Sequence, residues 1–393
     1  MLDDFNRLEA AERVTSPKDW RPAVEFDGTS GEATTRGFEP DEKPDFEQFL
    51  IEAGFDPAKY EIVGPPRTSR WQVARPFPLE PIWLTAYRFR FTNKVIDGID
   101  LPLAWANAKR NARKPIKPVE SGKALVVALA DFQIGKNDYR GGTEETLTRI
   151  LTAFNQLEEM FRKNHYERIL LVDVGDIVEG FSNAANEEQL YSNDLSIMQQ
   201  VDTSITLIWD IVCRAQKYCD QVSYVTIASN HCQWRINKQR VGKPGQDDWG
   251  VMIAKQIHRL AAATKTQLKV LIPEPHDESL AVDVFDDGFH ILGVWHGHQS
   301  NRPEGVPDWW KKQAFGNQPI TASTIALTGH FHHLRVQEIA PTSDGRSRFW
   351  VQASTMDSGS NWYRLNAGEE SQPGITIFEI EKNKPFTGTV RKI

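Results

Sequence analysis

Five segments of the chain end in residues that bind metal ions or move protons. Each end follows an apolar run: Asp131 follows ALVVALA, Asp176 follows ILLVDVG, Asn230 and His231 follow VSYVTIAS, His296 and His298 follow ILGVW, and His330 and His332 follow IALTG. A single Asp after a strand is ordinarily a turn or cap residue. Five such ends in one chain instead indicate a metal or catalytic centre. Carboxylate, carboxamide and imidazole donors without a thiolate favour Mn²⁺, Fe, Zn²⁺ or Mg²⁺ over a structural zinc site.

These side chains meet only if their apolar runs are neighbouring strands. The runs at 124–131, 169–176 and 222–230 alternate with helical patterns at 143–163 and about 187–218. Strands that are apolar on both faces and alternate with helices predict a buried parallel sheet. Ligands of such sheets gather outside the carboxyl ends of the strands. We therefore expect an α/β fold whose sheet edge carries the centre.

The later part of the chain predicts a second sheet. Strands are expected at 281–285, 289–295, 324–329, 348–353 and 375–380, with a helix near 249–263. Few helices separate these strands, so the second sheet should be mixed or antiparallel. Together, the strand ends of the two predicted sheets offer enough donors for two metal ions that share one carboxylate. Two ions about 3.5–4 Å apart suit displacement at phosphorus, because they activate water and neutralise charge on the phosphoryl oxygens.

The order and context of these donors resemble the signature of calcineurin-like metallophosphoesterases over residues 120 to 380. That resemblance implies an α/β/β/α sandwich of two mixed sheets flanked by helices. It implies that Asp131, Gln133 and His332 bind a first metal ion and that Asp176 bridges both ions. Asn230, His296 and His330 would bind the second ion, and His231 would act as general acid or electrostatic stabiliser beside the leaving oxygen. Mn²⁺ is the expected metal, with Mg²⁺, Fe, Zn²⁺ or Ca²⁺ as alternatives.

Three positions depart from the family pattern. Gln133 stands where the family has His, so the first site should bind metal more weakly or stand partly empty. Ser229 replaces a Gly, which matters little if its φ stays negative. Cys232 replaces the acid that often orients the catalytic His. Asp173 or Glu179 could orient His231 instead, while Cys232 as a nucleophile lacks an evident deprotonating partner.

Two short sequence motifs resemble those of nucleases within that family. The segment DFQIGK is similar to the opening motif of DNA repair nucleases of the Mre11/SbcD type, and GHFHH is similar to their closing motif. Gln133 with the following GGTEET resembles metallophosphoesterases encoded by bacteriophages. Loops beyond the ligands should line the substrate cleft. The candidate substrate-binding residues are Lys136, Arg140, Arg235, His298, Asn361, Trp362 and Tyr363; Asn183 and Asn186 could do so or cap a helix.

The first 119 residues are divided by charge. Residues 1–65 hold 7 Lys or Arg against 16 Asp or Glu, whereas residues 66–120 hold 11 against 4. The acidic part predicts a helix from Asp45 to Ala53, ended by Gly54, and exposed loop or partial disorder before it at 25–44. The basic part predicts one or two half-buried strands over 70–91. Its cations and aromatic residues suit nucleic acid, the alternatives being a strand with one wet face or pairing with the acidic part. The cations are Arg67, Arg70, Arg75, Arg88, Arg90, Lys109, Arg110, Arg113 and Lys114.

Length and composition set the remaining limits. The chain has 393 residues, 40% hydrophobic and 25% charged, with a net charge of −7. We expect an accessory region over 1–119 and a catalytic domain over 120–393. No apolar run reaches the ~18–20 residues of a membrane span, and no secretory signal is visible. Cys213, Cys219 and Cys232 are too few for a disulfide framework, so a reducing, cytoplasmic setting is expected.

The sequence thus predicts a phosphodiesterase with two divalent metal ions, acting on nucleic acid as a nuclease or exonuclease. A phosphodiesterase for small cyclic or linear nucleotides is the alternative. A catalytically weakened nucleic-acid-binding or scaffold protein is a third possibility, supported by Gln133 and Cys232.

Overall fold

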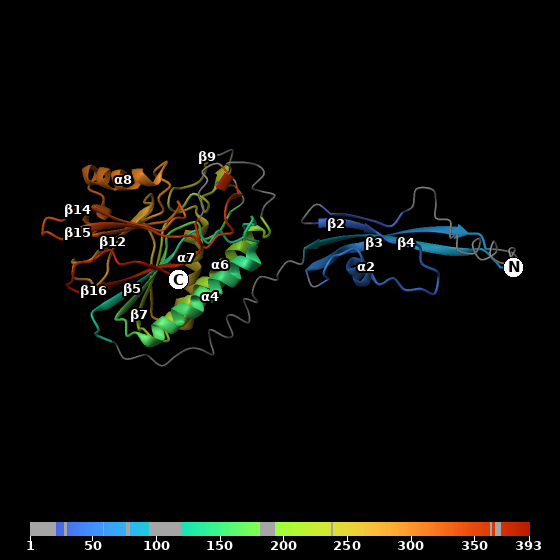
Figure 1. The fold of residues 1–393 in the computed structure, drawn as a ribbon, viewed down its shortest axis with the longest axis horizontal. Coiled ribbons are helices and arrows are strands. Elements are labelled where there is room, and N and C mark those ends of the chain that lie inside the picture. The colour runs from blue at the N-terminus through green and yellow to red at the C-terminus, as the bar shows by residue number, and fades with distance from the viewer. Residues whose placement is uncertain are drawn as a thin grey trace. The chain divides into compact units, whose positions relative to one another are not determined.

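The computed structural model describes residues 21–26, 30–57, 59–75, 79–93, 119–180, 193–236, 239–361, 364–365 and 371–393. Its internal contacts divide the chain into two compact units, Met1–Asp97 and Gly98–Ile393 (Figure 1). The sequence-based boundary at residue 119 stays a prediction, because residues 94–118 lie outside the described part. Each unit is built around its own apolar cores.

In its described residues, the N-terminal unit is an antiparallel sheet with one helix. The strand order is β1 (Ala23–Phe26), β2 (Ser30–Thr34), β4 (Ile82–Asn93) and β3 (Tyr60–Val73). Helix α2 (Phe46–Glu52) begins where the Asp45 carboxylate accepts the Gln48 N–H, and Gly54 follows it with a φ of 88°. Ala33, Leu50, Phe89 and Phe91 form its buried core. The helix predicted from Asp45 to Ala53 is therefore confirmed, with both end signals in use.

One expectation for this unit is wrong. Residues 25–44 were expected to form exposed loop, yet β2 lies within them and Ala33, Thr35 and Phe38 are buried. Strand β2 consists of small and polar residues, SGEAT, and lacks the alternating large apolar residues that signal a strand. Strand β2 is instead defined by its pairing with β4, which places Ala33 opposite Phe89. Its own side chains do not predict this burial.

The larger unit contains a six-stranded sheet ordered β10-β7-β6-β5-β16-β17. Its parallel part consists of β5 (Lys123–Leu129), β6 (Arg168–Asp173), β7 (Gln221–Thr226) and β10 (Leu268–Leu271). Strand β16 (Thr376–Glu381) pairs antiparallel with β5, and β17 (Arg391–Lys392) pairs antiparallel with β16. The sequence had assigned 375–380 to the second sheet. Its closeness in sequence to the late strands was misleading, because β16 instead covers the otherwise open edge of β5.

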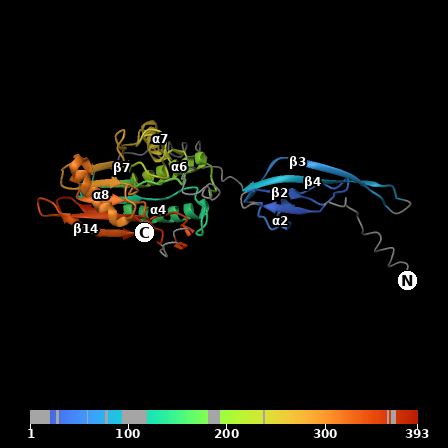
Figure 2. The same ribbon diagram turned by 90° about the horizontal axis from the view of Figure 1, so that it is seen from above.

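Three helices cover one face of this sheet. They are α4 (Thr143–Lys163), α6 (Ile197–Ala215) and α7 (Trp249–Thr264), and α6 lies between the other two (Figure 2). Their apolar faces share one buried cluster with β5, β6 and β7. Ser196 and Asp248 cap α6 and α7 by accepting the N–H groups of Gln199 and Val251. The helix expected over about 187–218 is thus α6 in its described portion, and residues 181–192 lie outside that portion.

A five-stranded mixed sheet, ordered β11-β12-β13-β15-β14, forms the next layer. Its strands are β11 (Ser279–Asp283), β12 (Ile291–Trp295), β13 (Ile325–Thr328), β14 (Arg335–Pro341) and β15 (Ser347–Gln352). A second apolar cluster joins the two sheets. Helix α8 (Val306–Lys312) contributes to a third cluster, which includes Trp295, Trp310 and Trp350, on the other side of this sheet (Figure 1). The mixed α/β class, with more than one mixed sheet, is confirmed.

The short elements are peripheral to these layers. They are three 3₁₀ turns, η1 (Pro303–Gly305), η2 (Gln313–Gly316) and η3 (Pro319–Ala322), and a small hairpin of β8 (Arg235–Ile236) and β9 (Gln239–Arg240). None of the helices in the described part of the chain combines the length and apolar composition that a membrane span requires.

Candidate metal centre

The candidate donors lie on short loops directly after the carboxyl ends of β5, β6, β7, β12 and β13. Five of these loop residues, Asp131, Gln133, Asp176, His330 and His332, have φ angles between 45° and 70°. They are half of the ten non-glycine residues with positive φ in the described part. A left-handed backbone costs roughly 1–2 kcal/mol for such residues. The packing of the two sheets stabilises these strained loop conformations, so the side chains are oriented before any ligand binds.

Asp176, His296 and His330 form the tightest donor set. One ligand atom from each lies within 4.8 Å of the others. Nε2 of His296 is 2.9 Å from Oδ2 of Asp176, and both side chains are buried. Nδ1 of His296 lies 2.8 Å from the carbonyl oxygen of Val174, which can only accept, so the ring proton sits on Nδ1. Although burial opposes the charged ring, Asp176 raises the pKa of His296 to about 9, so without a metal ion Nε2 also carries a proton, directed at Asp176. A divalent ion would displace that proton and take Nε2 as a ligand.

Two buried oxygen atoms on the donor loops lack hydrogen bonds. Oδ2 of Asp176 and Oδ1 of Asn230 are buried without a hydrogen-bond partner among the described residues, as is Nε2 of His296. Buried polar atoms left unpaired are costly, and a divalent cation bound by Oδ2 of Asp176 and Nε2 of His296 would satisfy both. Although burial opposes ionisation, His296 and His231 hold the pKa of Asp176 well below its usual range. These residues therefore fit a divalent metal ion.

The first donor set is arranged differently. Both carboxylate oxygens of Asp131 accept the His330 N–H, at 3.1 and 3.0 Å. Nε2 of His332 lies 3.4 Å from Oδ1 of Asp131. The Gln133 carboxamide oxygen accepts a hydrogen bond from Nζ of Lys136 at 2.7 Å. No second group of three His or acidic donors within 4.8 Å occurs in the described ranges. Gln133 therefore does not present an uncommitted oxygen to a first metal ion.

His231 is oriented by a glutamate. Oε2 of Glu179 lies 3.1 Å from Nδ1 of His231, and the backbone N–H of His231 donates to Oδ1 of Asp176 at 2.9 Å. Burial opposes the charged ring, but Glu179 and Asp176 raise the pKa of His231 to about 9. Asp173, the other candidate partner, instead accepts hydrogen bonds from the hydroxyls of Tyr224 and Thr226. The ring can therefore hold a proton at neutral pH.

Cys232 is buried in the apolar core, and burial raises the pKa of its thiol well above the usual value. A protonated, buried thiol is a poor nucleophile. The neighbouring Ser229 keeps a φ outside the positive range, and its hydroxyl accepts the Asp176 N–H at 2.8 Å. The serine thus contributes a contact that the glycine of the family pattern lacks.

The expected substrate-binding residues are only partly gathered at the donors. Rings of His298 and His296 lie 5.5 Å apart, and Nε2 of His298 lies 3.6 Å from Glu278. Arg140 donates to the carbonyl of Ser371 at 2.5 Å, and Arg235 donates to the carboxamide oxygen of Gln233 at 3.2 Å. Lys136 donates to Gln133, and the Asn361 N–H donates to Asp138. The remaining candidates lie outside the described residues: Trp362, Tyr363, Asn183 and Asn186.

Asp357 is a residue of this site that the sequence analysis missed. Its buried Oδ2 lies 2.6 Å from Nζ of Lys136 and 3.5 Å from Nδ1 of His332. Asp357 follows the carboxyl end of β15, so the same strand-end rule that found the other donors could have found it.

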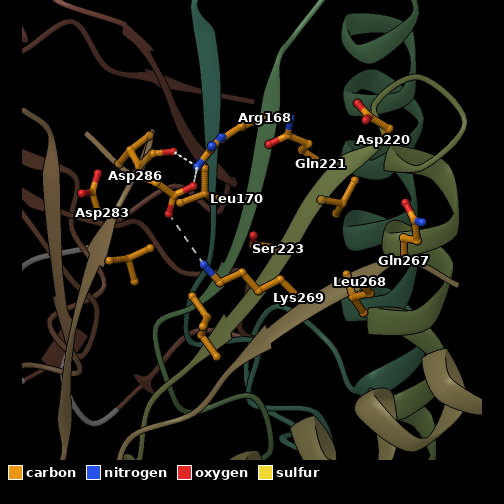
Figure 3. Close-up of a pocket in the computed structure, with 14 residues that line it drawn as sticks. Arg168, Leu170, Asp220, Gln221, Ser223, Gln267, Leu268, Lys269, Asp283 and Asp286 are labelled. Carbon is orange, nitrogen blue, oxygen red and sulfur yellow. Dashed lines mark hydrogen bonds and ion pairs between the residues drawn. The ribbon is translucent and has the colours of Figure 1, made fainter. Parts of the chain in front are cut away.

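A separate cavity of about 380 Å³ lies far from these donors along the strands. Arg168, Gln221 and Leu268, the first residues of β6, β7 and β10, line it, so it opens at the amino ends of strands whose carboxyl ends carry the centre (Figure 3). Arg168 and Lys269 point toward Asp286 there, at 2.7 and 4.0 Å. This cavity offers no metal-binding set.

In the N-terminal unit, acidic residues neutralise part of the basic surface. Arg88 and Arg90 pair with Glu32 at 3.2 and 4.0 Å, and Arg75 pairs with Glu39 at 3.1 Å. Arg70 lies over the ring of Trp83 at 5.8 Å. Lys109, Arg110, Arg113 and Lys114 lie outside the described residues. Pairing between the acidic and basic parts, one of the alternatives from the sequence, therefore accounts for several of these cations.

Comparison with protein-family models found no family whose model matches this chain. No curated protein matches it either. Solved structures that match include Vps29 of Entamoeba histolytica in complex with Zn²⁺, with 13% identity, a TM-score of 0.27, and coverage of 68% of this chain and 97% of that one. Another is a conserved protein of Streptococcus pneumoniae described as a predicted phosphoesterase, with 10% identity, a TM-score of 0.24, and coverage of 69% and 97%. Likenesses at these scores carry no argument about chemistry.

Proposed function

We propose that this chain is a metal-dependent phosphoesterase of the calcineurin-like type that hydrolyses phosphodiester bonds. The observation that carries the proposal is the meeting of Asp176 Oδ2 and His296 Nε2 at 2.9 Å, both buried and both without other hydrogen-bond partners. His330 and the unpaired Oδ1 of Asn230 come from the same sheet edges. Oxygen and imidazole donors of this kind suit Mn²⁺, Fe or Zn²⁺.

The chain's own residues would bind the metal ion and supply the proton for the leaving oxygen. When bound, a divalent ion would polarise the phosphoryl group and lower the pKa of a water molecule. Asp176 and Asn230 would hold that ion with oxygen atoms, while His296 is fixed by Val174 so that Nε2 faces it. His231, held against Glu179, keeps a proton that the leaving oxygen needs when the P–O bond breaks. Glu179 stabilises the charged ring and sets its orientation.

We favour a nucleic acid over a small nucleotide as the substrate. Support comes from exposed aromatic residues next to cations on segments that leave the centre. Trp234, with 42% of its surface exposed, precedes Arg235 and follows His231 by three positions. Tyr139, 38% exposed, lies under the guanidinium groups of Arg140 and Arg364 at 5.2 and 5.1 Å. Rings that stack bases, set beside cations that meet phosphates, are typical of single-strand binding surfaces.

The direct test is hydrolysis by protein that has been stripped of metal and refilled with Mn²⁺, Mg²⁺, Zn²⁺ or Ca²⁺. Single- and double-stranded DNA, RNA, cyclic nucleotides and bis-p-nitrophenyl phosphate would be assayed in parallel, with Asp176→Asn as the control. Cleavage of the polymers supports the nuclease. Turnover confined to small diesters supports the nucleotide phosphodiesterase, and metal binding without any turnover supports a binding protein.

A further inference from the structure

We infer that the centre binds one divalent ion per chain, and that the ammonium group of Lys136 occupies the role of a second ion. The inference rests on the proposed function. The single ion belongs to Asp176, His296 and His330, whose ligand atoms converge, with the unpaired Oδ1 of Asn230 as a further donor from the next loop. The donors on the other side, Gln133 and Asp357, converge on Lys136 instead.

The contacts of Lys136 resemble those of a bound cation. Nζ donates to Oε1 of Gln133 at 2.7 Å and to Oδ2 of Asp357 at 2.6 Å. The same Asp357 oxygen lies 3.5 Å from Nδ1 of His332, whose Nε2 lies 3.4 Å from Asp131. The positive charge of Lys136 thus contacts Gln133, one of the residues expected to hold the first ion, and is linked through Asp357 to His332 and Asp131. An ammonium group and a divalent ion that share these donors would repel each other at short range.

Lys136 is held in this place by its backbone. Gly135 before it has a φ of 100°, and a Cβ there would lie 2.5 Å from the side chain of Gln200. The Lys136 N–H donates to the carbonyl of Gln133, and its own carbonyl accepts the hydroxyl of Ser358. Only 11% of the Lys136 side chain is exposed. A buried ammonium must remain paired, so Lys136 cannot swing out to solvent at low cost.

The hydrogen bond from Lys136 also explains why glutamine suits position 133. A neutral imidazole at this position would compete for a metal ion, whereas a carboxamide oxygen accepts from a lysine without needing to lose a proton. The Gln133 amide nitrogen in turn lies 3.1 Å from Nε2 of His231 and can donate to it once that nitrogen has given up its proton. Gln133 therefore connects the fixed cation to the residue proposed to protonate the leaving group. Lys136 would contribute one positive charge beside the phosphoryl group where a second metal ion would contribute two.

Metal stoichiometry tests this directly. The full chain would be stripped with chelator, loaded with excess Mn²⁺, desalted, and measured by inductively coupled plasma mass spectrometry. One ion per chain is expected for the natural sequence, with an uncoupled Mn²⁺ signal in electron paramagnetic resonance. Two ions per chain with a spin-coupled signal would overturn the inference while leaving the phosphoesterase proposal standing. One ion without turnover of any phosphodiester would uphold the inference and contradict the proposed function.

A double variant tests the role of Lys136 itself. Gln133→His together with Lys136→Met restores an imidazole and removes the charge while keeping the bulk of the side chain. We expect the stoichiometry to rise from one to two, with the coupled signal appearing. Lys255→Met, at an exposed position of α7, is the matched control and should stay at one. A folded double variant, judged by circular dichroism, that still binds a single ion would show that Lys136 does not exclude the second.

Discussion

Oε2 of Glu179 lies 3.1 Å from Nδ1 of His231, and both side chains belong to loops that follow neighbouring strands β6 and β7. The residue directly after His231 is a buried cysteine, which cannot supply a carboxylate. Glu179 therefore provides from a different loop the acid that the position after His231 lacks. This pair stabilises a protonated ring and restricts its rotation, which are the two properties a general acid needs.

Replacing Glu179 with glutamine should reduce kcat by roughly a hundredfold, because the protonated ring loses its charged partner. The amide can still contact Nδ1, so the fold and the metal content should hardly change. Without the Glu179 charge the pKa of His231 should fall, and the basic limb of the pH–rate profile should move to lower pH. The measurement is kcat against pH with bis-p-nitrophenyl phosphate.

Glu144→Gln is the matched control for that variant, because Glu144 is exposed in the first turn of α4. It should leave the profile unchanged. An unchanged pH profile in Glu179→Gln would mean that Glu179 is only a structural neighbour of His231.

Asp176→Asn should abolish metal binding and reduce turnover by about a thousandfold or more. The change removes the negative charge that faces Nε2 of His296 while keeping the size of the side chain. Metal content and turnover should be lost together, which plasma mass spectrometry and the diester assay would show. Near-normal activity with a full metal complement would exclude Asp176 from the centre.

Gly175→Ala should disturb the centre more than its size suggests. Gly175 has a φ of 100°, and a Cβ there would lie 2.6 Å from both Nδ1 of His296 and Cβ of Ser229. We expect the free energy of unfolding to fall by about 1–3 kcal/mol and the affinity for Mn²⁺ to fall with it. Urea unfolding and isothermal titration calorimetry measure the two effects.

Gly345→Ala separates the backbone effect from the steric one. Gly345 has a φ of 87°, but a Cβ there would meet nothing within 4 Å. This variant should lose stability through its backbone alone and keep full metal affinity. Equal losses of metal affinity in both variants would contradict a local effect of Gly175 on His296.

Asp173 should make stability depend on pH. Burial raises its pKa from 3.8 to about 6, although the Gly175 N–H and the hydroxyls of Thr226 and Tyr224 oppose the shift. The folded state therefore keeps a proton that the unfolded state has already released, so this group stabilises the fold at low pH. That contribution should be lost as pH rises from about 4 to about 6 and amounts to at most about 3 kcal/mol.

Asp173→Asn should remove this dependence, because the amide resembles the protonated acid and can donate to the hydroxyl oxygens of Tyr224 and Thr226. The comparison is urea unfolding of the metal-free natural chain and the variant between pH 4.5 and pH 7. The natural chain should lose stability relative to the variant over this interval. A difference that stays constant, or that favours the natural chain at higher pH, would contradict the raised pKa.

The elements that carry the centre could be predicted because their patterns are strong. Helices α4 and α7 agree with the predicted ranges within a residue, and β5, β6 and β7 lie within or next to theirs. Continuous apolar runs that end on polar residues signal buried parallel strands with little ambiguity. Several strands were not predicted, among them β1, β2, β10 and β14. Strands β2 and β14 are half-exposed and polar, and they are defined by their pairing partners rather than by their own side chains.

By itself, the sequence determined which donors exist and that they follow the carboxyl ends of strands. Parallel strands place these ends together, so a residue's position after its strand predicts that Asp131, Asp176 and Asn230 gather on one sheet and His296 and His330 on the other. The packing of the two sheets brings Asp176 to His296 and His330. Only the tertiary structure decided how the remaining polar groups pair. Lys136 and Asp357 are 221 positions apart, and His231 had two candidate acids whose distances no spacing reveals. Side-chain pairs of this kind depend on loop backbone angles and on the packing of two sheets, which are properties of the whole fold.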